Sequence, residues 1–194
     1  MKLLKSAVFI FSLFPVFYLV YGVFTDNLGA NPIEKILHET GFWALTFLMI
    51  TLSVTPIRRL TKWNKIINLR RMLGLFAFTY ICLHFAVYLG LDRLLDWHEI
   101  VTDISKRPYI TLGFSAFLML IPLAITSTKG WMRKLGKRWQ KLHRLIYVAA
   151  IFGVIHFLWL VKKDITDPLV FAIILAILFA IRLYYLADKK LKLK

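Results

Sequence analysis

Six long apolar blocks constrain the fold of this chain more than any other feature. They cover residues 7–24, 41–55, 72–91, 109–125, 142–161 and 168–186. A helix needs about 17–25 apolar residues to cross the hydrocarbon layer of a membrane, and we expect the short second block to extend into Glu39-Thr40 and Pro56. The apolar residues run continuously and do not alternate, which argues against a transmembrane β-barrel. The sequence therefore predicts an all-α membrane protein, a bundle of six transmembrane helices.

The charged residues divide the connections between these blocks into two sides. The N-terminal tail, the connections after the second and fourth blocks together with Arg144, and the C-terminal end hold 20 of the 26 basic residues, with Asp188 as their only acidic residue. The other connections hold six basic and nine acidic residues. Because Lys-rich and Arg-rich loops stay in the cytoplasm, we expect both termini to be cytoplasmic. Topology and contact with lipid head groups then account for the net charge of +16, without nucleic-acid binding.

The connections leave no room for a second domain. The longest non-apolar stretches have about 15 to 17 residues, and the chain contains no GxGxxG or Walker sequence. We therefore expect a single domain over residues 1–194 that does not itself oxidise NAD(P)H. The one cysteine, Cys82, lies inside an apolar block, which excludes an intrachain disulfide and a cysteine-held iron–sulfur or zinc site.

The N-terminus resembles a signal peptide at first sight. Lys2 and Lys5 precede a run of apolar residues. This run continues to about Phe24 and contains no cleavage site of the small-x-small kind, so we interpret it as a retained first span.

Two histidines, His84 and His156, lie deep inside the third and fifth blocks. These blocks run in the same direction, and the histidines lie seven and five residues before the outer ends, so their depths agree within about one helical turn. Ionisable residues inside a membrane usually face the bundle interior and have a function. Two neutral imidazoles on facing helices can hold a haem iron; the alternative is a hydrogen bond from each to a neighbouring helix. His38 and His98 are expected in solvated outer loops.

The inner ends of the same two spans are less symmetric. His143 lies at the start of the fifth span, and the residue at equal depth on the third is Arg70. Arg70 shares a helix face with His84, about 21 Å away along the axis. It cannot ligate iron but could pair with a haem propionate or a flavin phosphate, or serve only as a topological charge. On an ideal helix His143 and His156 would lie about 140° apart, which weakens the prediction of a second haem unless the helix departs from ideal winding.

Three stretches carry a resemblance to a known family. They are Leu69-Arg-Arg-Met-Leu-Gly-Leu75 with Tyr80-Ile-Cys-Leu-His84, Lys106-Arg-Pro-Tyr-Ile-Thr-Leu-Gly113, and Leu135-Gly-Lys-Arg-Trp-Gln-Lys-Leu-His143-Arg-Leu-Ile-Tyr147. Together they closely resemble the MsrQ (YedZ) family, the haem-binding membrane subunit of the bacterial MsrPQ methionine sulfoxide reductase system. That family is part of the ferric reductase-like transmembrane superfamily, with NADPH oxidases and ferric reductases. The resemblance covers nearly the whole chain.

The resemblance implies a six-span b-type cytochrome of the bacterial inner membrane. Such a protein would accept electrons from a cytosolic flavin reductase or a membrane quinol and pass them to MsrP, a periplasmic molybdopterin enzyme that repairs oxidised proteins. The chain would be the electron-transfer subunit and not the catalytic one. The family's haem histidines fall on His84, His143 and His156, for one haem b or two, and flavin mononucleotide is associated with the family. Eukaryotic relatives carry a histidine where this chain has Arg70, so their two-haem pattern transfers only in part.

Two other functions fit parts of the sequence. A terminal ferric reductase would turn over ferric chelates without a periplasmic partner, and the missing nucleotide domain disfavours it. A small transporter or channel would need polar groups along a pathway or broken helices in repeated halves. The polar residues inside the spans gather on the third and fifth, and no internal repeat is evident, so the sequence favours electron transfer.

Overall fold

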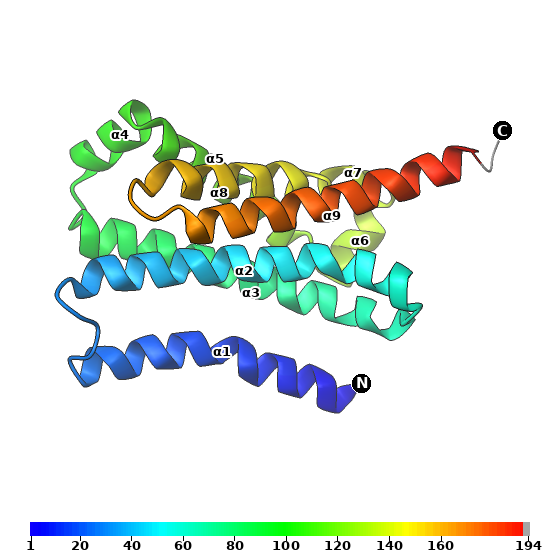
Figure 1. The fold of residues 1–194 in the computed structure, drawn as a ribbon, viewed down its shortest axis with the longest axis horizontal. Coiled ribbons are helices and arrows are strands. Elements are labelled where there is room, and N and C mark those ends of the chain that lie inside the picture. Colours follow the sequence, from blue (N-terminus) through cyan, green and yellow to red (C-terminus); the bar gives the residue numbers. More distant parts are fainter. Residues whose placement is uncertain (192–194) are drawn as a thin grey trace.

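The computed structural model describes residues 1–191, which form helices with short connections and no strand within that range. Six helical segments are long and apolar enough to cross a membrane, which confirms the predicted fold class (Figure 1). They are built on α1 (Lys2–Phe24), α2 (Pro32–Thr61), α3 (Arg70–Val87), α5 (Pro108–Ile125), α8 (Leu145–Leu160) and α9 (Thr166–Leu191). The shorter elements are η1 (Asn64–Leu69), η2 (Tyr88–Asp92), α4 (Trp97–Lys106), α6 (Lys129–Leu135) and α7 (Lys137–Leu142). Lys192 and Lys194, counted above among the basic residues, lie outside the described residues.

The bundle has two chemically different ends. α1 begins and α9 ends at the same end, which we call the basic end; it also carries the connections 62–69 and 126–144 (Figure 1). The opposite, acidic end carries the connections 25–31, 88–107 and 161–165. Six crossings place both termini on one side, and the charge distribution predicts that this side is cytoplasmic.

The second span is much longer than its apolar block. α2 begins at Pro32, and the Asn31 side chain caps it by accepting a hydrogen bond from the Glu34 backbone N–H at 3.3 Å. Proline suits a first helical turn because its missing N–H would have no partner there. The helix then passes Pro56 and ends at Thr61, with Lys62 in the left-handed conformation.

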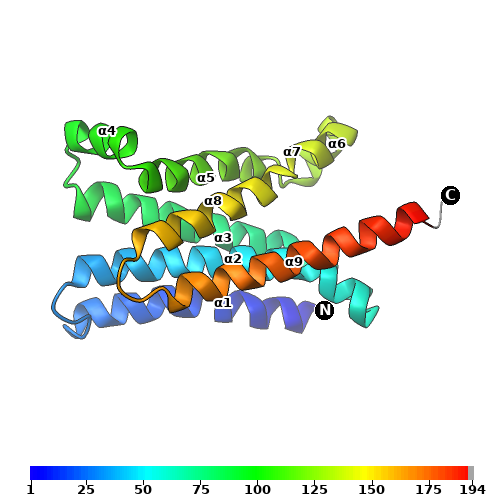
Figure 2. The same cartoon turned by 45° about the horizontal axis from the view of Figure 1, so that its top comes forward.

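α2 is the central helix of the bundle. It lies beside α3 along its length, while α5 lies beside α8, and α9 closes the bundle against α2 and α8 (Figures 1 and 2). The side chains of Leu52, Ala149 and Ala150 are fully buried where α2 and α8 contribute to the core. Two helix pairs, α2–α3 and α5–α8, therefore make up the body of the protein.

An arginine inside the last span donates a hydrogen bond to a backbone carbonyl that a proline leaves without its usual partner. Pro56 has no N–H to donate to the carbonyl of Leu52 one turn earlier. Arg182 of α9 donates to this carbonyl from Nη2 at 2.5 Å, and its guanidinium lies 5.2 Å from the ring centre of Tyr147. Arg182 is therefore half-buried and ties α9 to α2 and α8. The sequence predicts only a topological role for this arginine, whereas the structure shows a polar contact inside the bundle.

Candidate functional site

His84 of α3 and His156 of α8 face each other across the space between the two helix pairs. Their ring centres are 6.4 Å apart, and the ring planes are inclined by 78°. The sequence predicted that these residues lie at similar depth, and the structure brings them together. Each side chain is partly buried, and the acidic end of the bundle lies one to two helical turns away.

This separation suits one metal ion between the two rings. Metal–nitrogen bonds to imidazole are about 2.0–2.1 Å long, so His84 and His156, with ring centres 6.4 Å apart, could both bind one ion. Among the described residues no third histidine, cysteine or carboxylate completes a metal cluster with them, so the pair fits a metal whose other positions come from a cofactor such as haem.

A backbone carbonyl fixes the orientation of each imidazole. His84 Nδ1 lies 2.9 Å from the carbonyl oxygen of Leu37, and His156 Nδ1 lies 2.7 Å from that of Tyr109. Because a carbonyl oxygen only accepts, Nδ1 carries the proton in both rings and Nε2 keeps its lone pair. Metal-bound histidines usually donate their other N–H to a carbonyl or carboxylate in this way. Both rings are therefore oriented and protonated as iron ligands require.

A glycine lies one turn after each of these carbonyls. A Cβ atom on Gly41 would come within 3.0 Å of the His84 ring, and one on Gly113 would come within 2.9 Å of His156 Nδ1. Residues four apart share a helix face, so each histidine rests on a carbonyl at position i and a glycine at position i+4. The missing side chains let α2 and α5 approach the imidazoles closely enough for the hydrogen bonds to form.

The two halves of the site are copies of one arrangement. The histidine follows the carbonyl residue by 47 positions in both halves, and a shift of 72 residues carries Gly41 onto Gly113 and His84 onto His156. The same shift pairs further identical residues: Phe42 with Phe114, Ala44 with Ala116, Leu48 with Leu120, Leu73 with Leu145, Ala77 with Ala149, and Phe85 with Phe157. α2 and α5 both start at the acidic end, so the repeat is parallel. The expectation of no internal repeat was wrong.

We expect Gly113→Ala to disturb the His156 ring without changing any polar group. The added methyl must displace either the ring or α5, which weakens the carbonyl hydrogen bond and lowers metal affinity by about 10–100-fold. Retained haem per protein after stepwise dilution in detergent measures the effect. Gly90→Ala is the matched control, because a Cβ at Gly90 meets no atom within 4 Å. Equal haem retention in both variants would contradict a role for Gly113.

A buried carboxylate joins the two halves at the acidic end. Asp103 of α4 is 5% exposed and lies 2.9 Å from Nη2 of Arg93 and 2.9 Å from Nε of Arg107. It also accepts a hydrogen bond at 3.4 Å from Tyr88, one turn after His84. Arg107 lies two residues before Tyr109 and donates a hydrogen bond to its hydroxyl. This hydrogen bond, together with the negative charge of Asp103, raises the pKa of Arg107. Asp103 thus ties the end of the His84 helix to the start of the helix whose carbonyl holds His156.

His143 lies apart from this pair. Its Nε2 is 3.0 Å from the Thr126 hydroxyl, and its ring stacks on Trp139 with 4.0 Å between ring centres. The chain departs from helical winding at this residue, between α7 and α8, and not near Gly153. Arg70, the first residue of α3, is half-buried and lies at the same end of the bundle. His143 and Arg70 therefore lie at the same basic end, as the sequence predicts, and no second imidazole within residues 1–191 pairs with His143 there.

The sequence did not predict the partners of the imidazoles. Leu37 and Tyr109 contribute only backbone atoms, so their side chains carry no signal. Gly41 and Gly113 could have been found by aligning the chain with itself at a shift of 72 residues. His38 and His98 are exposed, as predicted, but they lie in the helices α2 and α4 and not in loops. His38 also lies edge-on to Phe157, with 5.6 Å between ring centres.

Known proteins resemble this chain over nearly its whole length. A family model described as the ferric reductase like transmembrane component matches residues 40–154, which include His84 and His143 and end two residues before His156. A protein of Herminiimonas arsenicoxydans is 51% identical over 99% of this chain and 89% of its own length. Proteins of Azospira oryzae (50% identical, 92% and 78% covered) and Rhodospirillum rubrum (49% identical, 94% and 88% covered) are similarly close.

All three relatives bear the name protein-methionine-sulfoxide reductase heme-binding subunit MsrQ. The matches cover the paired histidines, the two glycines and the Asp103 connection, since they extend over at least 92% of the chain. The chain therefore belongs to the MsrQ family within the ferric reductase-like transmembrane proteins.

Proposed function

We propose that this protein is the haem-binding membrane subunit of a bacterial methionine sulfoxide reductase system, located in the inner membrane. The observation that carries the proposal is the His84–His156 pair: two imidazoles with ring centres 6.4 Å apart, each donating Nδ1–H to a backbone carbonyl and keeping Nε2 free of a proton. The names of the MsrQ relatives support haem as the group and methionine sulfoxide reduction as the system.

His84 and His156 would hold one haem b, which supplies a reversible one-electron couple when bound. The residues of this chain fix its position and surroundings. The Leu37 and Tyr109 carbonyls keep both Nδ1 atoms protonated, and the apolar side chains of α2 and α8 exclude water. The site lies nearer the acidic end, which suits delivery of electrons to a periplasmic molybdopterin enzyme of the MsrP kind.

One haem per chain, held at the acidic end, fits the residues of this protein better than two. A haem at His143 would require its Nε2 to leave the Thr126 hydroxyl, and Arg70 opposite has no lone pair to offer a metal. We propose that Arg70 and His143 instead belong to the entry of electrons from a cytosolic flavin reductase or a quinol, with the arginine binding a flavin mononucleotide phosphate.

Reoxidation by the reductase partner tests the proposed function. The purified protein is reduced anaerobically with dithionite, freed of excess reductant and mixed with a periplasmic molybdopterin methionine sulfoxide reductase. We expect the haem spectrum to become oxidised only after methionine sulfoxide is added. If ferric citrate without the partner enzyme oxidises the haem as fast as the partner enzyme with methionine sulfoxide, or faster, the result would instead support a terminal ferric reductase.

Arg70→Ala is expected to slow reduction while leaving the haem in place. The substitution removes a cation about 21 Å along the helix axis from His84, so the absorption spectrum should be unchanged. Reduction of the haem by a flavin reductase with NADPH, followed by stopped-flow absorption, should slow by roughly five- to tenfold. This factor corresponds to the loss of one charge-assisted hydrogen bond. Arg58→Ala, at the same end of the bundle, is the control. Identical reduction rates in all three proteins would leave Arg70 as a topological charge.

A further inference from the structure

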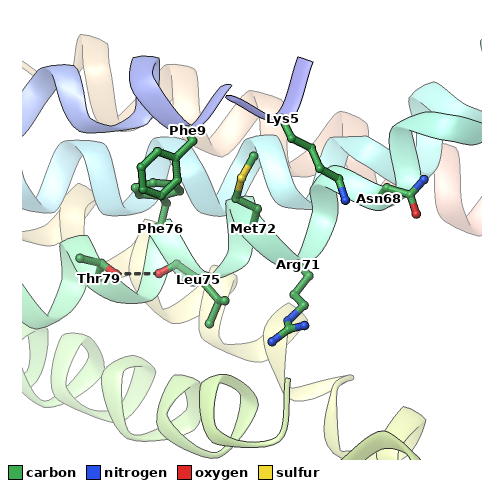
Figure 3. A pocket seen from close by; sticks show the side chains of 8 residues that line it. All are labelled: Lys5, Phe9, Asn68, Arg71, Met72, Leu75, Phe76 and Thr79. Carbon is green, nitrogen blue, oxygen red and sulfur yellow. Dashed lines mark hydrogen bonds between the residues drawn. The ribbon is translucent and has the colours of Figure 1, made fainter. Parts of the chain in front are cut away.

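A groove opens between α1 and α3 at the basic end of the bundle. It has a volume of about 490 Å³ and is lined by Lys5 and Phe9 of α1, Asn68 of η1, and Arg71, Met72, Leu75, Phe76 and Thr79 of α3 (Figure 3). Its size lies in the about 300–1,000 Å³ range of sites that hold small molecules. Neither the proposed haem site nor the basic-end residues around His143 contribute to it.

The groove is polar at its mouth and apolar inside. Lys5, Asn68 and Arg71 lie at the basic end, and Figure 3 shows the Lys5 side chain extending toward Asn68. The α3 residues that follow are spaced as one stripe of a helix, from Arg71 through Leu75 to Thr79, about 12 Å along the axis. Thr79 satisfies its own hydroxyl by donating to the Leu75 carbonyl at 3.0 Å, so the inner part presents no free donor.

Two contacts close the groove toward the middle of the membrane. The Phe9 and Phe76 rings meet edge to face, with 5.4 Å between their centres, and the Tyr80 hydroxyl donates to the Ser12 carbonyl at 2.7 Å. The groove opens on the side of these contacts that faces the basic end, and Phe9 is left 48% exposed. The groove therefore has a closed inner end, an apolar wall and a cationic mouth.

The charges at the mouth are not neutralised by the protein. No acidic residue lines the groove, and none of the ion pairs between described residues includes Lys5 or Arg71. The positive-inside rule places this mouth at the cytoplasmic membrane surface, where anionic phospholipid head groups lie. A cationic mouth above an apolar wall complements one kind of molecule, an anion with a hydrocarbon chain.

We propose that this groove binds an anionic phospholipid of the cytoplasmic leaflet. Its phosphate would lie at Lys5 and Asn68 with Arg71 contributing charge, and one acyl chain would lie on Met72, Leu75 and Phe76. The lipid would fill the space between α1 and α3 and hold the basic end of α1 against the bundle, where α1 otherwise packs sparsely.

Lipid titrations of the full chain test this site. The protein is delipidated in detergent and titrated with phosphatidylglycerol or phosphatidylcholine, and bound lipid is counted by native mass spectrometry. We expect tight retention of one phosphatidylglycerol, and the double variant Lys5→Gln with Arg71→Gln to weaken it by more than about tenfold, the effect of two cations at a membrane surface. The variant Lys65→Gln with Arg133→Gln removes one lysine and one arginine from exposed positions at the same end and serves as the matched control.

A second variant separates the groove from general surface charge. Leu75→Trp keeps both cations but fills the apolar wall, and we expect it to lower phosphatidylglycerol retention as well. Equal retention in the Lys5/Arg71 and Lys65/Arg133 variants, or unchanged retention in Leu75→Trp, would overturn the proposal. The proposal would also be overturned if phosphatidylcholine or a ubiquinone were retained as strongly as phosphatidylglycerol. The same holds if glycerol 3-phosphate alone raised the melting temperature as much as the lipid does.

Discussion

His84→Ala and His156→Ala should each lower the haem content to below about one tenth of that of the unmodified protein, because either change removes one of the two imidazoles that we propose hold the iron. Only the remaining imidazole would then be available to bind the haem. The two substitutions should have equal effects, since the repeat gives each ring the same carbonyl and glycine support. Pyridine haemochromogen analysis of purified protein measures the loss.

Two further histidine variants make this result specific. His98→Ala changes an exposed residue at the acidic end and should keep the full haem content. His143→Ala should also keep it, because this ring bonds Thr126 and stacks on Trp139. Full haem in both His84→Ala and His156→Ala would refute the paired site, whereas loss of half the haem in His143→Ala would indicate a second haem at the basic end.

Asp103→Asn should destabilise the whole protein and alter the haem site from a distance. The buried carboxylate pairs with both Arg93 and Arg107, and removing one member of a buried ion pair costs about 3 kcal/mol of stability. For a chain of this length that lowers the melting temperature by about 6–12 °C. Since Asp103 ties the His84 helix to the Tyr109 segment, the haem midpoint potential and the low-spin electron paramagnetic resonance signal should shift as well.

Glu99→Gln is the matched control for this prediction. Glu99 also pairs with Arg93, but its side chain is 47% exposed, and exposed ion pairs contribute about 0–1 kcal/mol. Asp103→Glu should partly restore the resonance signal by keeping the charge. A melting temperature that falls in Asp103→Asn while potential and resonance signal stay unchanged would reduce Asp103 to a purely structural contact.

The sequence predicted the parts of this protein that depend on long patterns. Six apolar blocks sufficed for six spans, and the matching depths of His84 and His156 sufficed to bring them together, because helical rise is regular. The bounds of α2 were missed because capping by Asn31 and Pro32 extends the helix beyond its apolar block.

Features built from backbone atoms or from distant residues were not predictable in the same way. The carbonyls of Leu37 and Tyr109 have no side-chain signature, and Arg182 appears as one more basic residue until its contact with the Leu52 carbonyl is seen. The repeat was overlooked because most residues of both halves are apolar, so few identities stand out. Asp103 was counted with the acidic outer connections, since nothing in the sequence indicates that it is buried.

A reduced-minus-oxidised absorption spectrum of the detergent-purified chain, with the haem quantified per protein, tests whether the paired imidazoles hold a haem. We expect a b-type spectrum typical of two histidine ligands, with one haem per chain held by His84 and His156. Absence of haem after expression with sufficient haem supply would contradict it and would leave the two imidazoles as hydrogen-bonding links between helices.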